Sequence, residues 1–431
     1  MSSIVKVWWL LASLLLTSAA LTAADTAPLS SKSPGDDPDD VYWDTTIANF
    51  NGGLNGSVTA LTVYDGKLIV GGGFTSAGGI AVNGIAAWDG TSWSPLGSGM
   101  AAGVLTVYDN KLIAGGGNHI AAWDGSSWTP LGTGLDGPVT ALSEYGGKLV
   151  AGYGCSYEDC HPRARVSSWD GLTWSLLSAW GQHGFWYYRV AGLAAYDSVL
   201  VVSIRYDYSD GGGGWLETLG GTSGLELCGG GGPLWVFGGR LFAATFEWSM
   251  GICGNGDLIA WEGDSCSSGA IFGEPDCHWV NALTEYDGKP IAGGYFTTAG
   301  GIAAKNIAAW GGSSWSQLGS GIGENAEVYA LAVYDNKLIV GGNFATAGGK
   351  ISPYLAVWTK RYLQCGDADG AGEVNLVDIV YTVNWMFANG PAPVDEAAGD
   401  YNCDGRPNIA DAVYMVNYVF RGGPQPCKGC K

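Results

Sequence analysis

Histidine and basic residues are scarce in this sequence of 431 residues. Its four histidines are scattered without a recurring spacing, which argues against a copper or zinc centre built on histidine. Lysine and arginine together number 20 against 40 acidic residues, so the formal net charge is −20. A field of this sign repels phosphate backbones, and we therefore expect no nucleic-acid partner.

Long apolar runs are absent after the N-terminal segment. Residues 1–24 contain Lys6, an apolar run and then small residues, in the order typical of a secretory signal peptide. This run is too short to span a membrane, and no later run approaches the necessary length. We therefore expect a secreted, extracellular protein without a membrane span, in which residues 25–40 form a polar linker. Its ten cysteines are then expected to form disulfides rather than zinc sites.

One sequence phrase returns along the middle of the chain. Residues 58–100 begin with VTALTVYDGKLIVGGGF and end with IAAWDGTSWSPLGSGM, and they are echoed at 104–135, 280–322 and 328–358. The turn signature of this phrase, in the form YDGKL, occurs seven times. It begins at Tyr64, Tyr108, Tyr145, Tyr196, Phe237, Tyr286 and Tyr334. Each full unit contains four short strand patterns joined by turns, which predicts a mainly β fold, a β-propeller with seven blades.

The two ends of the repeat region predict how the ring closes. The seventh unit stops at LAVWTKR and lacks the last strand pattern, whereas residues 50–58 align with residues 131–139 of a regular repeat. An N-terminal strand would therefore complete the last blade, with Ile47 in the place of the usual tryptophan. Over residues 41–361 the repeats resemble the kelch-like and galactose-oxidase-like propellers of bacterial and fungal surface proteins. The resemblance implies a fold and leaves the activity open, because propellers serve enzymes, binders and scaffolds.

Units three to five depart from the regular phrase and form the candidate ligand-binding surface. Aromatic and basic residues gather there, and aromatic planes match the C–H faces of sugar rings. The candidates are Trp180, Trp186, Tyr187, Arg189, Arg205 and Tyr206. The alternative is that these aromatic residues only cap the core of the ring. Spacing assigns no nucleophile and base, so no catalytic residue is predicted.

Two twelve-residue stretches near the C-terminus have the spacing of calcium loops. Such a loop places oxygen ligands at positions 1, 3, 5, 7, 9 and 12, and the ligand at position 7 is a backbone carbonyl. In residues 400–411 these positions are Asp400, Asn402, Asp404, Arg406, Asn408 and Asp411. In residues 367–378 the ligands are Asp367, Asp369, Glu373, Asn375 and Asp378. We expect two Ca²⁺ sites, of which the first binds more weakly because Ala371 replaces a side-chain ligand.

The two loops also predict a small helical module. Each loop is followed by a stripe of apolar residues at helical spacing, and each has Asp at its last ligand position with no helix pattern before it. In these respects residues 362–431 resemble a type I dockerin with two F-hand calcium loops. The resemblance implies docking into a cohesin-type domain of a scaffold, with partner choice at the two residues before the last ligand of each loop. These residues are Leu376, Val377, Ile409 and Ala410.

The sequence leaves three functions open. The leading hypothesis is a secreted bacterial protein whose dockerin-like module binds calcium and docks to a scaffold, displaying the propeller as a binding surface for a ligand such as a polysaccharide. The first alternative is a secreted carbohydrate-active enzyme that hydrolyses glycosidic bonds. The second is a structural surface protein whose calcium-stabilised tail has no partner. Exposure of the four residues before the last ligands would favour docking, and their burial would favour the structural alternative.

Overall fold

The computed structural model describes two compact units of the chain. The described residues are 37–44, 53–117, 119–154, 164–181, 187–208, 211–220, 229–246, 248–249, 252–253, 257–262, 265–273, 278–359, 368, 375–388, 399–402, 404, 406 and 408–424. One unit is Tyr42–Thr359, and the other comprises Met1–Val41 and Lys360–Lys431. The predicted signal peptide, most of the linker and all cysteine side chains lie outside the described part. Within that part, no helix has the length and apolarity that crossing a membrane requires.

The first three sheets each contain four antiparallel strands. The first sheet consists of β1 (Val58–Tyr64), β2 (Lys67–Gly72), β5 (Ile85–Trp88) and β6 (Trp93–Pro95). The second consists of β7 (Val104–Tyr108), β8 (Lys111–Gly116), β9 (His119–Trp123) and β10 (Trp128–Pro130). The third consists of β11 (Val139–Tyr145), β12 (Lys148–Gly154), β13 (Ala164–Trp169) and β14 (Trp174–Trp180). A small hairpin, β3 (Ser76–Ala77) and β4 (Ile80–Ala81), separates β2 from β5.

The next three sheets contain four to six strands. The fourth consists of β15 (Tyr187–Tyr196), β16 (Val199–Tyr208), β17 (Gly211–Leu219), β20 (Trp248–Ser249) and β21 (Ile252–Cys253). The fifth consists of β18 (Gly231–Phe237), β19 (Arg240–Thr245), β22 (Asp257–Glu262), β23 (Ser265–Gly273), β26 (Thr298–Ala299) and β27 (Ile302–Ala303). The sixth consists of β24 (Trp279–Tyr286), β25 (Lys289–Tyr295), β28 (Ile307–Trp310) and β29 (Trp315–Gln317).

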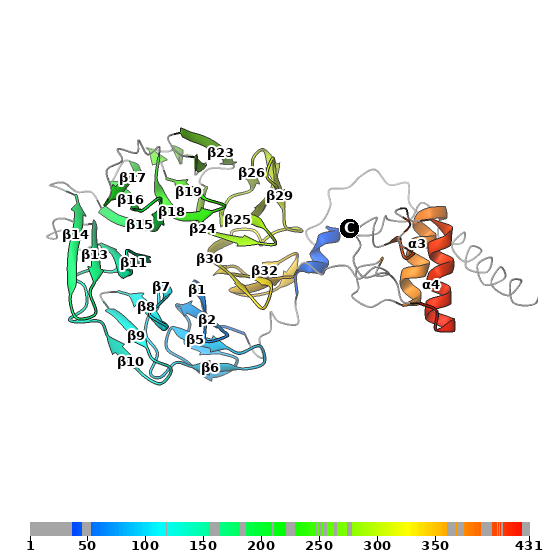
Figure 1. Cartoon of the computed structure of the whole chain (residues 1–431), viewed down its shortest axis with the longest axis horizontal. Coiled ribbons are helices and arrows are strands. Elements are labelled where there is room, and N and C mark those ends of the chain that lie inside the picture. Colours follow the sequence, from blue (N-terminus) through cyan, green and yellow to red (C-terminus); the bar gives the residue numbers. More distant parts are fainter. Residues whose placement is uncertain are drawn as a thin grey trace, which may run out of the picture. The chain divides into compact units, whose positions relative to one another are not determined.

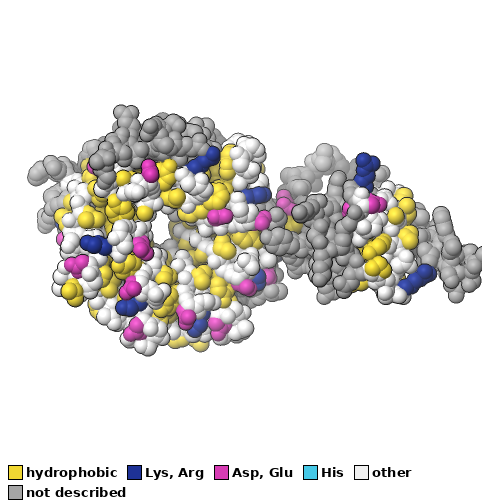
Figure 2. Space-filling model, in the orientation of Figure 1, with side chains coloured by type: hydrophobic (Ala, Val, Ile, Leu, Met, Phe, Trp, Pro, Cys, Tyr) yellow, Lys and Arg dark blue, Asp and Glu magenta, His cyan; other side chains and the backbone are white. Residues whose placement is uncertain are grey.

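The last sheet has only three strands. They are β30 (Glu327–Tyr334), β31 (Lys337–Asn343) and β34 (Leu355–Trp358), with the hairpin β32 (Thr346–Ala347) and β33 (Lys350–Ile351) between the second and third. The sheets follow one another around a central opening, with the first strand of each sheet innermost (Figures 1 and 2). This arrangement is a β-propeller. The predicted count of seven four-stranded blades is not reproduced, because among the described residues six sheets have four or more strands and the last repeat lacks its fourth.

The tight turns between the first two strands of each sheet form as the sequence predicts. Asp65 and Gly66 join β1 to β2 and both have a positive φ, of 49° and 68°. Two residues with positive φ are typical of the hairpin turn that matches the twist of neighbouring strands. Tyr64, at the start of this turn, donates its hydroxyl hydrogen to the backbone carbonyl of Asn110 in the next turn of the ring, at 3.3 Å.

Glycine in the second strands lets neighbouring sheets approach closely. A Cβ added to Gly293 in β25 would lie 2.5 Å from Cγ1 of Val328 in β30, closer than real side chains allow. Gly341 in β31 stands in the same relation to Val58 in β1, so the last sheet packs directly on the first. These contacts agree with the expectation that the glycine-rich strands serve close backbone approach.

The tryptophans of the repeat also join neighbouring sheets. Trp123 and Trp128 face each other across β9 and β10, with ring centroids 5.3 Å apart. Trp123 contacts the backbone at Gly97 in the preceding sheet, and Trp128 donates from Nε1 to the carbonyl oxygen of Leu96 at 2.9 Å. The aromatic pair therefore belongs to the core between sheets.

The turns between the third and fourth strands are held by an aspartate. The carboxylate of Asp89 accepts hydrogen bonds from the backbone N–H groups of Thr91 and Ser92, at 2.9 and 2.8 Å. These hydrogen bonds, of which the one from Ser92 has the largest effect, hold the pKa of Asp89 well below its usual range. The carboxylate is therefore charged at any ordinary pH. Asp124 repeats the arrangement in the second sheet.

The N-terminal segment reaches the last sheet at Trp43. This residue forms an antiparallel bridge with Trp358 in β34, and the two rings lie 5.0 Å apart. Nε1 of Trp43 donates to the carbonyl oxygen of Leu318 in the preceding sheet, as Trp128 does to Leu96. Trp43 therefore takes the place of the repeated tryptophan. The sequence assigns that place to Ile47, which itself lies outside the described residues, and the contacts of Trp43 contradict that assignment. The alignment fails because the chain between Trp43 and Leu54 is longer than the matching segment of a regular repeat.

The second unit contains two helices, α3 (Leu376–Ala388) and α4 (Ile409–Arg421). They pack on each other around a small core of Ala368, Ile379, Val383, Tyr401, Ala412 and Met415. The hydroxyl of Tyr401 is buried and lies 2.6 Å from that of Thr382. On the N-terminal side a 3₁₀ helix, η1 (Pro38–Tyr42), begins within the predicted linker.

The position of Trp43 can be tested by comparing two substitutions. Trp43 is 2 % exposed, so Trp43→Ala removes a buried ring and its hydrogen bond to Leu318. We expect the free energy of unfolding of the propeller to fall by about 3–5 kcal/mol, measured by urea denaturation followed by tryptophan fluorescence. Ile47→Ala is the control for the alternative alignment, and a larger loss in that variant would contradict the placement of Trp43.

Candidate functional site

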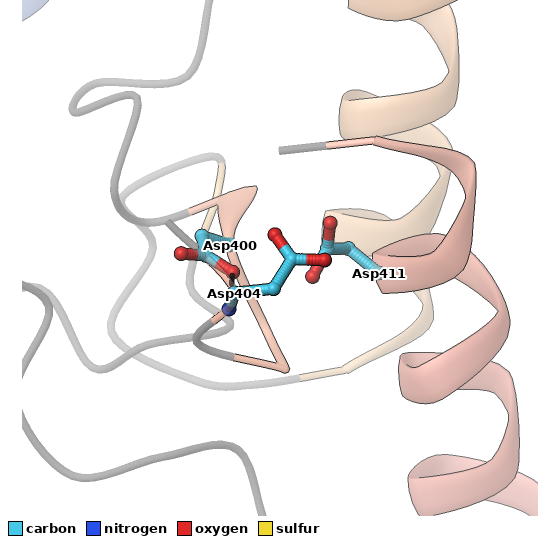
Figure 3. Close-up of side chains that lie close together, drawn as sticks. All are labelled: Asp400, Asp404 and Asp411. Carbon is cyan, nitrogen blue, oxygen red and sulfur yellow. Dashed lines mark hydrogen bonds between the residues drawn. The ribbon is translucent and has the colours of Figure 1, made fainter. Parts of the chain in front are cut away.

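The second loop brings three carboxylates together at the start of α4. Asp400, Asp404 and Asp411 each offer an oxygen, and these oxygens lie within 4.8 Å of one another. Figure 3 shows the three side chains converging on a shared space beside the first turn of α4. Oxygen ligands in this number and spacing fit Ca²⁺, which prefers carboxylate, amide and backbone oxygens.

Hydrogen bonds within the loop fix the direction of these oxygens. Asp404 donates its backbone N–H to the carboxylate of Asp400 at 3.1 Å and to the amide oxygen of Asn402 at 2.8 Å. The side-chain amide of Asn408 donates to the carbonyl of Arg406 at 2.8 Å and to Asp404 at 3.3 Å. All six predicted ligand residues of the second loop are therefore described, and they face one another through this network.

Asp411 combines a structural role with its place among the candidate ligands. Its side chain is fully buried and accepts hydrogen bonds from the backbone N–H groups of Asn402 and Asn408, at 3.0 and 2.8 Å. Asn408 in turn caps α4 by accepting from the N–H of Ala410 at 2.9 Å. Burial and the neighbouring charges of Asp400 and Asp404 raise the pKa of Asp411. A cation among these carboxylates would offset that repulsion.

The first loop is described only at its end. Asp367, Asp369 and Glu373 lie outside the described residues, so their predicted role as ligands stays a prediction. Asp378 is fully buried and accepts from the backbone N–H of Asn375 at 2.8 Å, as Asp411 does from Asn408. The ends of the two loops are therefore alike.

The four predicted docking residues are at the surface of the module. Leu376 is 47 % exposed, Val377 55 % and Ile409 48 %, and Ala410 is exposed as well. All four lie in the first turn of α3 or α4. They are thus not part of the core that Tyr401 and Met415 form.

The candidates in the fourth sheet divide between its two faces. Arg189 in β15 and Arg205 in β16 are direct partners across the ladder, and Tyr187 opposes Asp207 on the same face. Because successive side chains of a strand point to opposite faces, Tyr206 lies on the other face, where the centroid of its ring is 5.8 Å from that of Trp215.

The remaining two candidates are separate from the arginines. Trp180 belongs to the cluster between the third and fourth sheets, and its Nε1 donates to Glu217 at 3.1 Å. Trp186 lies outside the described residues. The described residues of the candidate ligand-binding surface therefore do not form a single surface, because alternation along β16 separates Arg205 from Tyr206.

The two arginines line a pocket of about 140 Å³ on the inner strands of the ring. Its walls come from the first strands β11, β15, β18 and β24, which border the central opening in Figure 1, and from the second strands β16 and β19. Besides the arginines, they include Thr140, Phe246, Trp279 and Asn281.

Arg205 is held firmly in this pocket. Its guanidinium donates to both carboxylate oxygens of Asp207, at 3.1 and 3.3 Å from Nε, and its Cζ lies 3.1 Å from the ring centroid of Phe246. Burial and the neighbouring Arg189 lower the pKa of Arg205 to about 10, which leaves it charged at neutral pH.

A second polar group, not predicted from the sequence, lies beside the pocket. Glu327 in β30 accepts from Nε1 of Trp279 at 2.6 Å, from Nδ2 of Asn281 at 2.9 Å and from the hydroxyl of Tyr329 at 2.9 Å. Burial, followed by the hydrogen bond to Glu327, raises the pKa of Tyr329 to about 12.

The repeat pattern in the sequence could have identified these pocket residues. Five first strands, β1, β11, β15, β24 and β30, carry a valine that packs between sheets, whereas Ala102 and Gly231 take its place in the other two repeats. Residues beside the valines of β11, β15 and β24 line the pocket, and the residues beside Val328 of β30 lie next to it. Comparing these two positions across the repeats gives Thr140, Arg189, Ala191, Trp279, Asn281, Glu327 and Tyr329.

Comparisons with known proteins give distant structural likenesses and no family. No protein family and no curated protein matches the sequence. Among solved structures, the chain is similar to the Dos1 propeller, with 12 % identity, a TM-score of 0.39 and coverage of 70 % of this chain and 78 % of that one. It is similar to YCF48 bound to D1 peptide, with 14 % identity, a TM-score of 0.42 and coverage of 72 % and 94 %. It is also similar to an ulvan lyase of polysaccharide lyase family PL25, with 12 % identity, a TM-score of 0.42 and coverage of 70 % and 93 %.

These likenesses are too distant to transfer an activity. The sheets around the central opening, their hairpins and their close packing remain the basis for the fold. The chain is a β-propeller protein with two short helices near its C-terminus.

Proposed function

We propose that this is a secreted bacterial protein whose C-terminal module binds Ca²⁺ and docks to a scaffold, so that the propeller is displayed as a ligand-binding surface. The convergence of Asp400, Asp404 and Asp411 carries the proposal, because three like charges within 4.8 Å repel one another unless a cation lies among them. When bound, Ca²⁺ would supply that charge and tie the loop to α4.

The exposed residues before Asp378 and Asp411 support docking over a purely structural tail. Apolar side chains at the first turn of each helix contribute little to the module's own core, whereas they suit the buried centre of an interface. The partner is a cohesin-type domain, as implied by the resemblance to a type I dockerin with two F-hand loops.

The proposal also includes the number of blades in the propeller and its type. We take the three-stranded sheet and the N-terminal segment at Trp43 as a seventh blade of a kelch-like or galactose-oxidase-like ring. Two backbone hydrogen bonds support it, from Asp44 N–H to Val357 and from Thr359 N–H to Tyr42, both at 2.9 Å.

Calcium binding can be measured by isothermal titration of the full-length protein after removal of metal with chelator. Asp404→Ala removes an exposed ligand and leaves the buried Asp411, with its hydrogen bonds from Asn402 and Asn408, in place. We expect the affinity of the second site to fall by about tenfold or more. Glu144→Ala, an exposed acid on the propeller, is the control and should bind as the unmodified protein does. Equal titrations of the unmodified protein and Asp404→Ala would contradict the site.

Docking can be measured by biolayer interferometry with recombinant cohesin domains from bacterial scaffolds. We expect binding in Ca²⁺ that is lost in chelator, and a loss of about tenfold or more in affinity for Ile409→Asp, because a charge in an apolar interface is costly. Leu172→Asp is the matched control, since Leu172 is 82 % exposed on the propeller. Binding that survives chelator and is unchanged in Ile409→Asp would contradict the proposed docking surface.

A second candidate function is hydrolysis of glycosidic bonds, favoured by the pair formed by Tyr329 and Glu327. A hydroxyl within hydrogen-bond reach of a carboxylate is the arrangement of a nucleophile and its base, and some glycosidases use a tyrosine nucleophile. The pair lies beside the pocket through Trp279 and Asn281.

This candidate predicts activity that depends on both residues. On nitrophenyl glycosides, Tyr329→Phe and Glu327→Gln should each reduce kcat by about a hundredfold or more. Tyr108→Phe is the control, because the hydroxyl of Tyr108 bonds to the carbonyl oxygen of Gly147 at a turn outside the pocket. Turnover that is unchanged in both variants would exclude the pair as catalytic residues.

A further inference from the structure

Two arginines lie directly opposite each other in the pocket of the propeller. Arg189 in β15 and Arg205 in β16 are register partners, and their mutual repulsion contributes to the lowered pKa of Arg205. Like charges placed directly opposite each other destabilise a sheet. The chain as a whole is strongly acidic, so general solubility does not call for two positive charges here.

Only one of the two arginines has an acidic partner among the described residues. Asp207 forms an ion pair with Arg205, at 3.1 Å from Nε. Glu327, the other carboxylate whose charge acts on Arg205, already accepts from Trp279, Asn281 and Tyr329. Within the described part of the chain, Arg189 takes part in no ion pair and is exposed.

The size and lining of the pocket limit which ligand could bring a negative charge to Arg189. At about 140 Å³ it is smaller than pockets that enclose drug-sized ligands, so it suits one small group. Phe246 and Trp279 provide apolar surface, and Thr140 and Asn281 provide polar groups. A guanidinium binds planar carboxylates through two parallel hydrogen bonds.

We propose that this pocket binds a carboxylate-bearing sugar, a uronic acid unit of an acidic polysaccharide, with the carboxylate on Arg189. Arg205 is a positioning residue, since Asp207 and Phe246 fix its guanidinium. The sugar ring lies against the apolar wall that Trp279 provides. This inference rests on the proposal that the propeller is a ligand-binding surface, and it names the class of ligand.

The test is isothermal titration of the full-length protein in Ca²⁺ with glucuronate, acetate, inorganic phosphate and cellobiose. We expect glucuronate to bind more tightly than acetate, phosphate or cellobiose, because only glucuronate offers both a carboxylate and a sugar ring. Arg189→Gln should weaken glucuronate binding by about tenfold or more. Arg240→Gln, at the first residue of β19 and outside the pocket, should leave it unchanged. Added salt should weaken binding to the unmodified protein.

The remaining outcomes separate this inference from the proposed function. Glucuronate binding that is absent, or equal in Arg189→Gln and the unmodified protein, overturns the inference. If glucuronate does not bind but cellobiose binds in the same titrations, the proposal of a polysaccharide-binding surface stands and only the acidic ligand is excluded. Acetate or phosphate binding as tightly as glucuronate would show a site for a simple anion and overturn the assignment to a sugar acid.

Discussion

The packing of a first-strand valine against a second-strand glycine joins neighbouring sheets at four of the junctions of the ring. The contact recurs between neighbouring sheets: Gly115 meets Val139, and Gly293 meets Val328, with an added Cβ lying 2.8 and 2.5 Å from the valine Cγ1. Any side chain at these glycines would push the inner strands apart, so the sequence phrase GG follows from the geometry of the ring. The last contact, between Gly341 and Val58, joins the two ends of the repeat region.

The same packing explains why the candidate ligand-binding residues are where they are. Since the valine is fixed between sheets, alternation along the strand turns its two neighbours away from that contact, and these two positions differ from repeat to repeat. Arg189 precedes Val190 and Trp279 precedes Val280, and both line the pocket. Core packing therefore fixes the position of the valine, and the two residues that flank it can be polar.

Much of this fold could be predicted from the sequence, because its main determinants are local. The turn at Asp65 and Gly66, the paired tryptophans and the glycine contacts all follow from short patterns that repeat. Closure at Trp43 could not be placed, because the longer segment before Leu54 breaks the alignment.

The candidate sites were predictable to different degrees. The calcium loop was predictable because its ligands lie within twelve neighbouring residues. The pocket was only partly predictable, because Arg189 and Arg205 pair within one hairpin, whereas Glu327 comes near Arg205 only when the ring forms.

The bridge between Trp43 and Trp358 also determines how the propeller would respond to mechanical force. The last strand of the ring, β34, ends at Trp358, and from Lys360 on the chain belongs to the C-terminal unit. A pull on that module is therefore transmitted first to β34, which hydrogen-bonds to β31 on one side and to the segment around Trp43 on the other. These bonds lie across the direction of the strand, so a pull along β34 loads them in shear and together. The junction that closes the ring is thus also the anchor that would resist extraction of its final strand.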